Sequence, residues 1–312
     1  MRNAFRNRAL GATLVALALV ATACGSGEDS GADTTTSAGT DLDGPTIVVG
    51  STNFGEQEIL GEIYAQALAA AGYPVETKFQ LGTREVVNPA LKNGDIDLMV
   101  EYTGTLLTFE GGTSSTNSDQ THADLESILN GQGLTALDYA PAQDKNGFVV
   151  TADTAAEYGL TSVSDLAGQN GNLVLGGPPE CPDREFCLIG LNDVYGLEFA
   201  SFQPLDVGGP LTVAALEGGE IDVGLLFTSD GVIAARGFVL LEDDKLLQPA
   251  ENIVPVIRTD VLAEYDAALP ALLNSISAKI TTAELSELNK RFGIDAEDAD
   301  VLAKEWLAAN GF

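Results

Sequence analysis

Apolar side chains recur along this chain with two periods, which predict strands that alternate with helices. Residues 46–51 (TIVVGS) are a short apolar run ending in glycine and serine, typical of a buried strand. In residues 56–71 the apolar positions share one helical face instead: Ile59, Leu60, Ile63, Ala67, Leu68 and Ala71. Gly72 ends this predicted helix.

Further elements of the same kind complete a first group. A strand is predicted at 75–81, a helix begins at 86–91, and a strand follows at 98–100. Strands that alternate with helices in this way are typical of a parallel sheet. The first group therefore predicts one open α/β lobe.

The pattern restarts after Phe148 and predicts a second open α/β lobe. The predicted strands lie at 147–151, 172–177, 199–205 and 221–227, and the predicted helices at 162–168, 190–197 and 211–216. A strand at 252–258 and three helices are expected to close the chain. Thr281 and Glu284 form a capping-box pattern in one of these helices, and Gly293 ends it.

One pattern occurs twice, 125 positions apart: ALKNGDIDLMVEYTGT at 90–105 and ALEGGEIDVGLLFTSD at 215–230. Each copy runs through glycine, an acid and Ile-Asp into a strand, and ends on an aromatic residue followed by threonine. Open α/β sheets bind ligands at the carboxyl ends of their strands. Tyr102 and Phe227 are therefore predicted to face each other across one cleft between the lobes. The alternative is that both rings are core residues, although the hydroxyl residues after them favour the cleft.

The start of the chain has the features of an export signal. Arg2, Arg6 and Arg8 precede an apolar run at 9–23, which is shorter than a typical transmembrane helix. Residues 1–23 are accordingly predicted to be a signal peptide.

Residues 21–24 (ATAC) resemble the processing box of bacterial lipoproteins, which predicts lipid on Cys24. An ordinary signal peptide with a cysteine nearby is the alternative. Residues 24–44 are rich in Gly, Ser, Thr and Asp and offer little to bury, so they predict a flexible tether.

The chain is strongly acidic, with 46 Asp and Glu against 15 Lys and Arg. Without the three leader arginines its net charge is about −34. Nucleic acids and anionic lipid surfaces are bound through basic patches, so neither is an expected partner.

Three cysteines and one histidine limit the chemistry further. With Cys24 assigned to lipid, Cys181 and Cys187 in CPDREFC are predicted to form a disulfide in an oxidising compartment. Too few ligands remain for a zinc site, and no metal or cofactor is expected. His122 lies in the polar segment GGTSSTNSDQTH and is predicted to be a solvated loop residue.

Catalytic groups are scarce, so an enzyme is not expected. No Ser-His-Asp set can be assembled, and no Gly-rich phosphate loop with a lysine precedes a helix. The paired carboxylates are predicted to be turn and cap residues before strands: Asp95, Asp97, Glu220 and Asp222. A glycosidase stays open as an alternative on carboxylates alone.

Binding groups are better represented. The faces of aromatic rings such as Tyr102 and Phe227 attract cations, including cations that have no hydrogen-bond donor of their own. Arg184 lies between the two cysteines and is predicted to clamp a carboxylate from a loop that is ordered before the ligand arrives. A surface charge that balances Asp183 and Glu185 is the alternative role for Arg184.

Several of these motifs together resemble the solute-binding proteins of osmoprotectant ABC importers, which take up glycine betaine, choline and carnitine. They are IVVGSTNFGEQEILGEIYAQAL, ALKNGDIDLMVEYTGT, DREFCLIGLNDVYGL and FVLLEDDK, and the resemblance covers residues 46–312. It implies a type II-like two-lobed periplasmic-binding-protein fold with two crossovers, with lobe 1 at 45–147 plus 253–312 and lobe 2 at 148–252. It also implies a lipid-anchored monomeric receptor outside the cytoplasmic membrane, which delivers its solute to a permease and an ATPase. A sensor that kept the fold is the alternative.

The resemblance implies a role for individual residues in the cleft. Tyr102 matches a tyrosine of the family's aromatic cage around the quaternary ammonium, and Thr105 matches a threonine that contacts the ligand. Arg184 matches the arginine that grips the carboxylate. Phe227 replaces another cage tyrosine, and Thr52 replaces a polar or basic residue of the first loop.

Asn146 and Val213 stand where two further cage tyrosines are expected, so two of four rings remain. Each cation–π contact is worth on the order of 0.5–2 kcal/mol, and losing two predicts at least about tenfold weaker binding of a trimethylammonium group. Either other rings hold the ligand, or it is another polar solute such as a polyol or a less methylated zwitterion.

Overall fold

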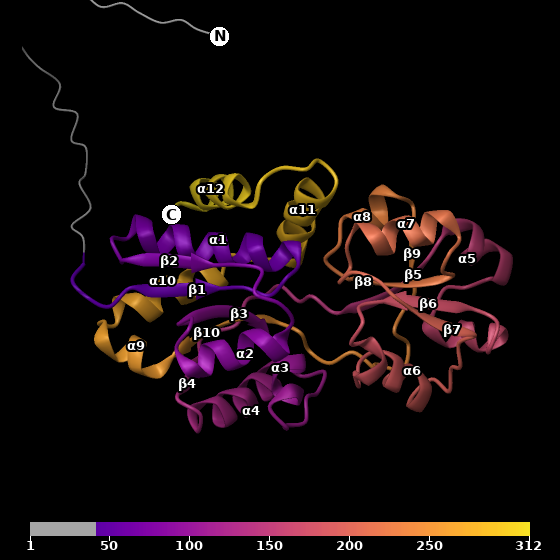
Figure 1. Cartoon of the computed structure of the whole chain (residues 1–312), viewed down its shortest axis with the longest axis horizontal. Coiled ribbons are helices and arrows are strands. Elements are labelled where there is room, and N and C mark those ends of the chain that lie inside the picture. The colour runs from indigo at the N-terminus through magenta and orange to yellow at the C-terminus, as the bar shows by residue number, and fades with distance from the viewer. Residues whose placement is uncertain (1–41) are drawn as a thin grey trace, which may run out of the picture. The chain divides into compact units, whose positions relative to one another are not determined.

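The computed structural model describes residues 42–312, so the predicted signal peptide, Cys24 and most of the predicted tether lie outside the described residues. The described residues contain two five-stranded sheets (Figure 1). None of the helices in residues 42–312 has the length and apolar character needed to span a bilayer.

The first sheet has the strand order β2-β1-β3-β10-β4. Its strands are β1 (Ile47–Gly50), β2 (Val75–Lys78), β3 (Leu98–Tyr102), β4 (Leu134–Ala136) and β10 (Ile253–Arg258). β1 runs parallel to β2 and β3, as predicted, whereas β10 is antiparallel to β3 and β4. The sheet is therefore mixed, and its strand β4 was not predicted.

The second sheet repeats this arrangement with the order β7-β6-β8-β5-β9. Its strands are β5 (Asn146–Val150), β6 (Val174–Gly177), β7 (Ser201–Pro204), β8 (Val223–Phe227) and β9 (Val239–Leu240). β6 is parallel to β7 and β8, and β5 is antiparallel to β8 and β9. The lobe boundary that the resemblance implied, between residues 147 and 148, falls inside β5.

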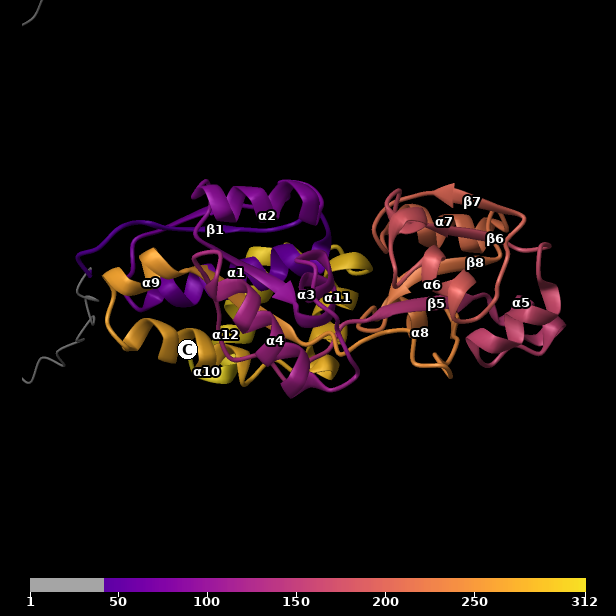
Figure 2. The same cartoon turned by 90° about the horizontal axis from the view of Figure 1, so that it is seen from below.

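Helices cover both faces of the first sheet (Figures 1 and 2). One face packs on α1 (Gly55–Ala70), α9 (Thr259–Glu264), α10 (Ala268–Ser277), α11 (Thr282–Gly293) and α12 (Ala299–Asn310). The other packs on α2 (Arg84–Asn93), α3 (Thr103–Phe109) and α4 (Ser118–Asn130). Because strand side chains alternate between faces, Leu98, Val100 and Tyr102 join the first core while Met99 joins the second.

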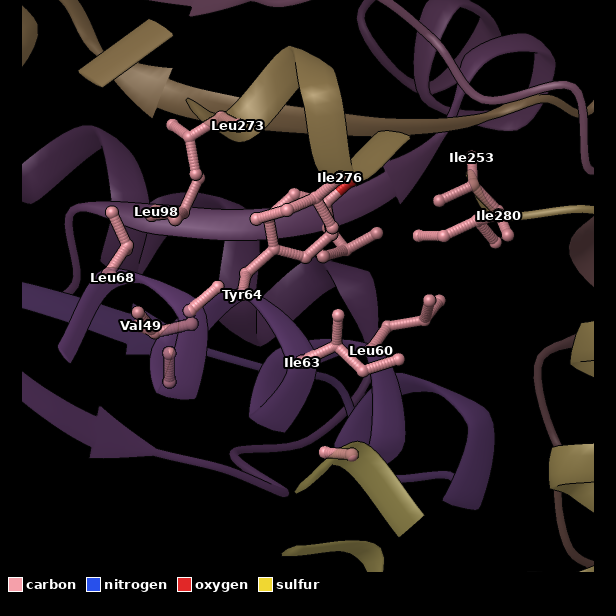
Figure 3. Packing of buried hydrophobic residues seen from close by; sticks show 14 of the residues in the cluster. Val49, Leu60, Ile63, Tyr64, Leu68, Leu98, Ile253, Leu273, Ile276 and Ile280 are labelled. Atoms are coloured by element: carbon pink, nitrogen blue, oxygen red, sulfur yellow. The ribbon is translucent and has the colours of Figure 1, made fainter. Parts of the chain in front are cut away.

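Tyr64 lies at the centre of the larger core, between α1 and α10 (Figure 3). Leu60, Ile63 and Leu68 of the same helix surround it, which confirms the predicted apolar face of α1. Its hydroxyl hydrogen-bonds to the Ser277 hydroxyl at 2.8 Å, so this buried polar group is satisfied.

The second sheet is covered in the same way. One face packs on α7 (Pro210–Gly218) and α8 (Val232–Ala235). The other packs on α5 (Ala152–Tyr158), α6 (Leu188–Asp193) and the 3₁₀ turns η1 (Val163–Gln169) and η2 (Cys181–Asp183). Cys181 and Cys187 are bonded to each other, as predicted, and pack in this second core.

Two predictions about helices were wrong. Four helices, not three, follow β10 in residues 259–312. His122 lies within α4 rather than in a loop, because Asn117 caps that helix by accepting a hydrogen bond from the Gln120 N–H. Its ring is largely buried, Nε2 lies 2.8 Å from the Leu137 carbonyl oxygen, and the ring packs edge-on against Tyr139, so His122 is structural.

The chain passes between the two sheets twice, between β4 and β5 and between β9 and β10. The two crossover segments lie side by side: the Asp144 N–H donates to the Glu251 carbonyl at 3.0 Å, and the Ile253 N–H donates to the Ala142 carbonyl at 3.2 Å. Asp144 and Glu251 are thereby held between the sheets.

Candidate ligand-binding site

The repeated sequence pattern builds the same local structure in each lobe. Gly94 ends α2 and Gly219 ends α7, both in the left-handed region with φ of 82° and 67°. Glycine adopts this conformation without strain, and the backbone N–H groups of these residues bond the last helical carbonyls. The chain thus turns from helix to strand identically in both lobes.

Asp97 and Asp222 then fix the strand that follows. The Asp97 carboxylate accepts from the Val48 N–H at 2.9 Å, and that of Asp222 accepts from the Val174 N–H at 2.8 Å. Both aspartates therefore tie β3 and β8 to the parallel strand beside them. This confirms that they are structural turn and cap residues.

The carboxyl ends of β1, β3, β6 and β8 open into one cavity of about 670 Å³. Residues of both sheets line it, from the loop after β1 and the start of α2 to the disulfide loop after β6. A cleft between two α/β lobes was predicted from the repeat, and the cavity occupies this place.

Three aromatic rings form one wall of this cavity. Phe54 stacks on Tyr102 with centroids 6.2 Å apart and on Phe227 with centroids 5.3 Å apart. Tyr102 and Phe227 thus share the predicted cleft, but they do not face each other directly, since Phe54 lies between them. Phe109 and Phe186 also line the cavity.

Tyr102 belongs to both the cavity and the core. Its side chain is only 6% exposed and packs with the larger core of the first sheet. Its hydroxyl donates to Glu56 Oε1 at 2.6 Å. The two alternatives for this ring, core residue and cleft residue, are therefore both correct.

Glu56 is the centre of a buried group of polar side chains that joins the lobes. Its Oε2 accepts from the Ser229 hydroxyl and from the Asn289 amide, each at 2.6 Å. The Ser229 N–H donates to Asp144 at 3.1 Å. Ser229 comes from the turn after β8, so these bonds attach lobe 2 to helices α1 and α11 of lobe 1.

The carboxyl groups of this cluster favour their neutral forms. Burial raises the pKa of Glu56, and burial together with the nearby Glu56 and Asp230 charges raises the pKa of Asp144 well above its usual range. Burial likewise raises the pKa of Asp230 to about 7. Desolvation and like charges act in the same direction here.

A second buried network lies at the start of α3. The Arg84 guanidinium forks onto Glu101 at 2.7 and 2.8 Å and reaches the Thr105 hydroxyl at 3.0 Å. Glu251 Oε2 accepts from the Gly104 and Thr105 N–H groups at 3.1 Å each. Burial raises the pKa of Glu251 to about 7, although the Thr105 N–H and Arg84 oppose the rise.

Arg184 lies on the cavity wall, as predicted, and its Nη2 atom is 2.5 Å from Glu85 Oε1. Glu85 belongs to the first turn of α2, so this ion pair spans the two lobes. Burial raises the pKa of Glu85, but the Thr83 hydroxyl, a backbone N–H and Arg184 together lower it below its ordinary value. A ligand carboxylate would compete with Glu85 for Arg184.

Of the other predicted site residues, three line the cavity and one does not. Thr52, Thr105 and Asn146 line the cavity. The Asn146 amide donates to the Phe186 carbonyl at 2.9 Å, and it thereby holds the disulfide loop. Val213 packs in the core between α7 and the second sheet and does not contribute to the cavity lining, which Val207 of the preceding loop provides.

Several residues of the cavity wall were not predicted: Phe54, Gln57, Arg84, Glu101 and Glu251. Phe54 precedes α1 in the loop after a strand, which is where open α/β sheets place ligand contacts, so its position was a usable signal. Glu101 and Glu251 had no such signal in the sequence, because a chain with 46 acidic residues gives no reason to single out any one carboxylate.

Stability is expected to fall as pH rises from 5 to 8. Glu251 and Asp230 have folded pKa values of about 7, above their ordinary 4.5 and 3.8. Their stabilising contribution is complete below the ordinary values and is lost as pH rises through 7. Urea unfolding should show a loss of at least about 2 kcal/mol across this range.

Glu251→Gln tests this pH dependence, because an amide oxygen can still accept from Thr105 but cannot titrate. The variant should make the pH profile less steep, with the part due to Asp230 remaining, while the exposed control Glu264→Gln should keep the full slope. A profile that rises between pH 5 and 8 would contradict the prediction.

The fold and the cavity together define a two-lobed solute-binding protein. The sequence profile described as the substrate-binding domain of ABC-type glycine betaine transport systems matches residues 45–309. The chain belongs to this family. It is therefore a substrate-binding protein of an ABC importer and not an enzyme, as predicted.

Individual relatives agree with this assignment. The chain is 29% identical to the glycine betaine-binding protein YehZ of Escherichia coli, over 85% of this chain and 91% of the relative. It is 27% identical to the carnitine transport binding protein OpuCC of Listeria monocytogenes, over 86% of this chain and 87% of the relative. A crystal structure of a glycine betaine/carnitine/choline ABC transporter protein superposes on this structure with a TM-score of 0.69. The two sequences are 25% identical, and the match covers 86% of this chain and 98% of the other.

Proposed function

We propose that this protein captures a small solute with a quaternary ammonium group, of the glycine betaine, choline or carnitine type, and delivers it to a membrane permease with its ATPase. Two of its relatives are named for binding glycine betaine and carnitine. The cavity between the two sheets is the proposed binding site.

The composition of the cavity wall carries this proposal. Phe54, Tyr102 and Phe227 form a stacked aromatic wall, and ring faces attract cations that cannot donate hydrogen bonds. Seven carboxylates and two guanidinium groups line the same cavity. Arg84 and Arg184 are each paired with a carboxylate of the wall, and burial raises the pKa of two further acids, Asp144 and Glu251. The three other acids of the wall, Glu180, Asp183 and Glu185, leave it negatively charged, which favours a cationic ligand.

A thermal-shift screen tests the proposal. The chain from residue 25 onward, which contains all described residues, is heated with glycine betaine, choline, carnitine, proline or a sugar. A true ligand at a hundred times its Kd should stabilise the folded protein by about 2.7 kcal/mol. Stabilisation by the quaternary ammonium compounds is expected, and stabilisation by proline or a sugar alone would refute the proposal.

The proposed location is the outer face of the cytoplasmic membrane, with lipid on Cys24 and a monomeric receptor. One acyl chain binds a bilayer weakly, whereas two or more retain a protein firmly. Cys24→Ser is therefore expected to move nearly all of the protein from the membrane fraction into the soluble exported fraction, as followed by immunoblot. A parent protein that is already soluble after export would rule out the anchor.

A further inference from the structure

The turn after β8 packs lobe 2 directly against helix α11 of lobe 1. A Cβ atom at Gly231 would lie 2.6 Å from the Ser286 carbonyl oxygen and 2.6 Å from Lys290 Cβ, and both of these residues belong to α11. Only glycine allows so close an approach of two backbones. Ser229, two positions earlier in the same turn, is completely buried. Lobe 2 therefore docks on lobe 1 through this turn, in addition to the two crossover segments.

Two carboxyl groups meet at Ser229, one from each side of the lobe boundary. The Ser229 hydroxyl donates to Glu56 Oε2 at 2.6 Å, and the Ser229 N–H donates to Asp144 Oδ1 at 3.1 Å. Glu56 belongs to α1 of lobe 1, whereas Asp144 lies in the crossover segment that leads into β5 of lobe 2. The two carboxyl groups also hydrogen-bond to each other. An ionised carboxylate only accepts hydrogen bonds, so one of the two must carry a proton.

The surroundings place this proton mainly on Asp144. Burial raises the pKa of both groups. Three donors oppose the rise at Glu56, namely the hydroxyls of Ser229 and Tyr102 and the Asn289 amide. At Asp144 the neighbouring carboxylates add to the effect of burial, and its pKa lies well above the usual range. Asp144 thus donates the shared proton to Glu56 across the lobe boundary.

No ion pair neutralises these two carboxyl groups. None of the lysines and arginines in residues 42–312 lies within ion-pair distance of either one. Lys290, on the facing helix α11, pairs with Glu287 and Asp295 instead. The elements packed around the two carboxyl groups also carry these titratable residues: Tyr102, Lys145, Asp230 and Glu251. Loss of the shared proton would therefore place two negative charges side by side in a buried boundary.

We propose that one proton shared by Glu56 and Asp144 fastens lobe 2 to lobe 1, and that the lobes separate more readily as the surroundings become less acidic. Two adjacent carboxylates repel each other, and parting the lobes lets water solvate both. The fastening is complete below the ordinary Asp144 pKa of 3.8 and weakens as the pH rises, because the raised pKa belongs to the fastened state alone. It depends on the two-lobed fold and not on which solute the cavity binds.

The other ion pair between the lobes does not share this pH dependence. Arg184 and Glu85 are both charged from pH 5 upward, because the pKa of Glu85 is lowered by the Thr83 hydroxyl, a backbone N–H and Arg184. This pair therefore contributes equally at pH 5 and pH 8. A change in lobe separation across that range reports the shared proton rather than the Arg184 contact.

Small-angle X-ray scattering of the solute-free chain from residue 25 onward tests the proposal. In the parent protein the radius of gyration should increase between pH 5 and pH 8 as the lobes part. Asp144→Asn supplies an amide that can donate to Glu56 and accept from the Ser229 N–H at every pH. This variant should show less than about half of the increase, with the part due to Asp230 remaining.

Hydrogen exchange of the Ser229 N–H measures the size of the effect, because this group is freed when its bond to Asp144 breaks. After correction for the intrinsic pH dependence of exchange, its opening constant should rise at least about tenfold between pH 5 and pH 8 in the parent. Asp144→Asn combined with Asp230→Asn removes both raised acids and should hold the change within about threefold. The N–H groups of β8 exchange through unfolding and should open far less often.

Two further variants control the measurement. Asp153→Asn makes the same chemical change at an exposed position of α5 and should behave like the parent at every pH. Gly231→Ala should enlarge the radius of gyration at pH 5 as well, because its Cβ would push the turn away from α11.

An increase that is absent in the parent, or equal in the parent and Asp144→Asn, overturns the inference. Should Asp144→Asn fail to fold, Glu56→Gln removes the other charge of the pair and should likewise reduce the increase. Because no solute is present, either result leaves the proposed function intact. Failure to bind any quaternary ammonium solute would refute the proposed function and leave the shared proton untouched.

Discussion

Replacing Arg84 by methionine is expected to destabilise the protein by about 3–5 kcal/mol, because the change leaves the buried Glu101 carboxylate without its partner. Arg84 holds Glu101 with two hydrogen bonds, and the Glu101 side chain is 2% exposed. Glu251 lies in the same network and adds a further carboxylate. Urea unfolding followed by circular dichroism measures the loss.

Arg184→Met is the matched control for this prediction. Arg184 also pairs with a glutamate, but the side chains of Arg184 and Glu85 are 28% and 47% exposed. Exposed ion pairs contribute about 0–1 kcal/mol, so this variant should unfold almost like the parent.

A double variant separates the charge effect from lost packing. Arg84→Met with Glu101→Leu removes both charges of this ion pair and should recover much of the stability. If Arg84→Met is no less stable than Arg184→Met, the buried network does not hold the start of α3 as described.

Replacing Phe54 by leucine is expected to weaken ligand binding by about 1–3 kcal/mol, a loss of roughly fivefold to 150-fold in affinity. Phe54 stacks on both Tyr102 and Phe227, so its ring joins the aromatic groups of the two lobes. Leucine keeps apolar volume in the wall but removes the ring face that attracts a cation. Calorimetric titration with carnitine and choline measures the loss.

Phe109→Leu is the control for Phe54→Leu. Phe109 also lines the cavity, but it makes no ring stacking contact among the described aromatic pairs, and it is 38% exposed. Its replacement should change affinity by less than about threefold. Equal losses in both variants would show that the cavity wall needs apolar volume rather than the stacked rings.

The elements with strong local signals were predicted from the sequence. The helix 56–71 and all strands of the two sheets except β4 and β9 follow from apolar periodicity, and the repeated Gly-acid-Ile-Asp pattern marks two identical turns from helix to strand. The pairing of Cys181 with Cys187 followed from their being the two cysteines left near each other. These features depend on residues close together in the sequence.

The features that were missed depend on long-range contacts or on residue types without a distinctive pattern. The antiparallel placement of β10 beside β3 joins residues about 150 positions apart, which no local period encodes. The helix α4 was hidden by its polar composition, although Asn117 is a recognisable cap. The resemblance implies a site position for Val213, where the family carries a tyrosine, but its place on α7 directs it into the core.

The role of Phe54 shows why the cavity wall was only partly predicted. The resemblance implies rings at two positions that Asn146 and Val213 occupy in this chain. The structure instead supplies a ring from the loop before α1, between the two aromatic residues that the repeat had marked. A comparison that goes position by position does not detect an aromatic residue supplied by a different element of the fold.

The relative affinity for choline and for 3,3-dimethylbutan-1-ol, its uncharged analogue with carbon in place of nitrogen, tests the central claim most directly. The two molecules have the same shape, so only the positive charge distinguishes them. If the stacked rings and the carboxylates of the cavity recognise a quaternary ammonium group, calorimetry should show choline binding at least about tenfold more tightly. Equal affinities, or tighter binding of the uncharged alcohol, would contradict the account.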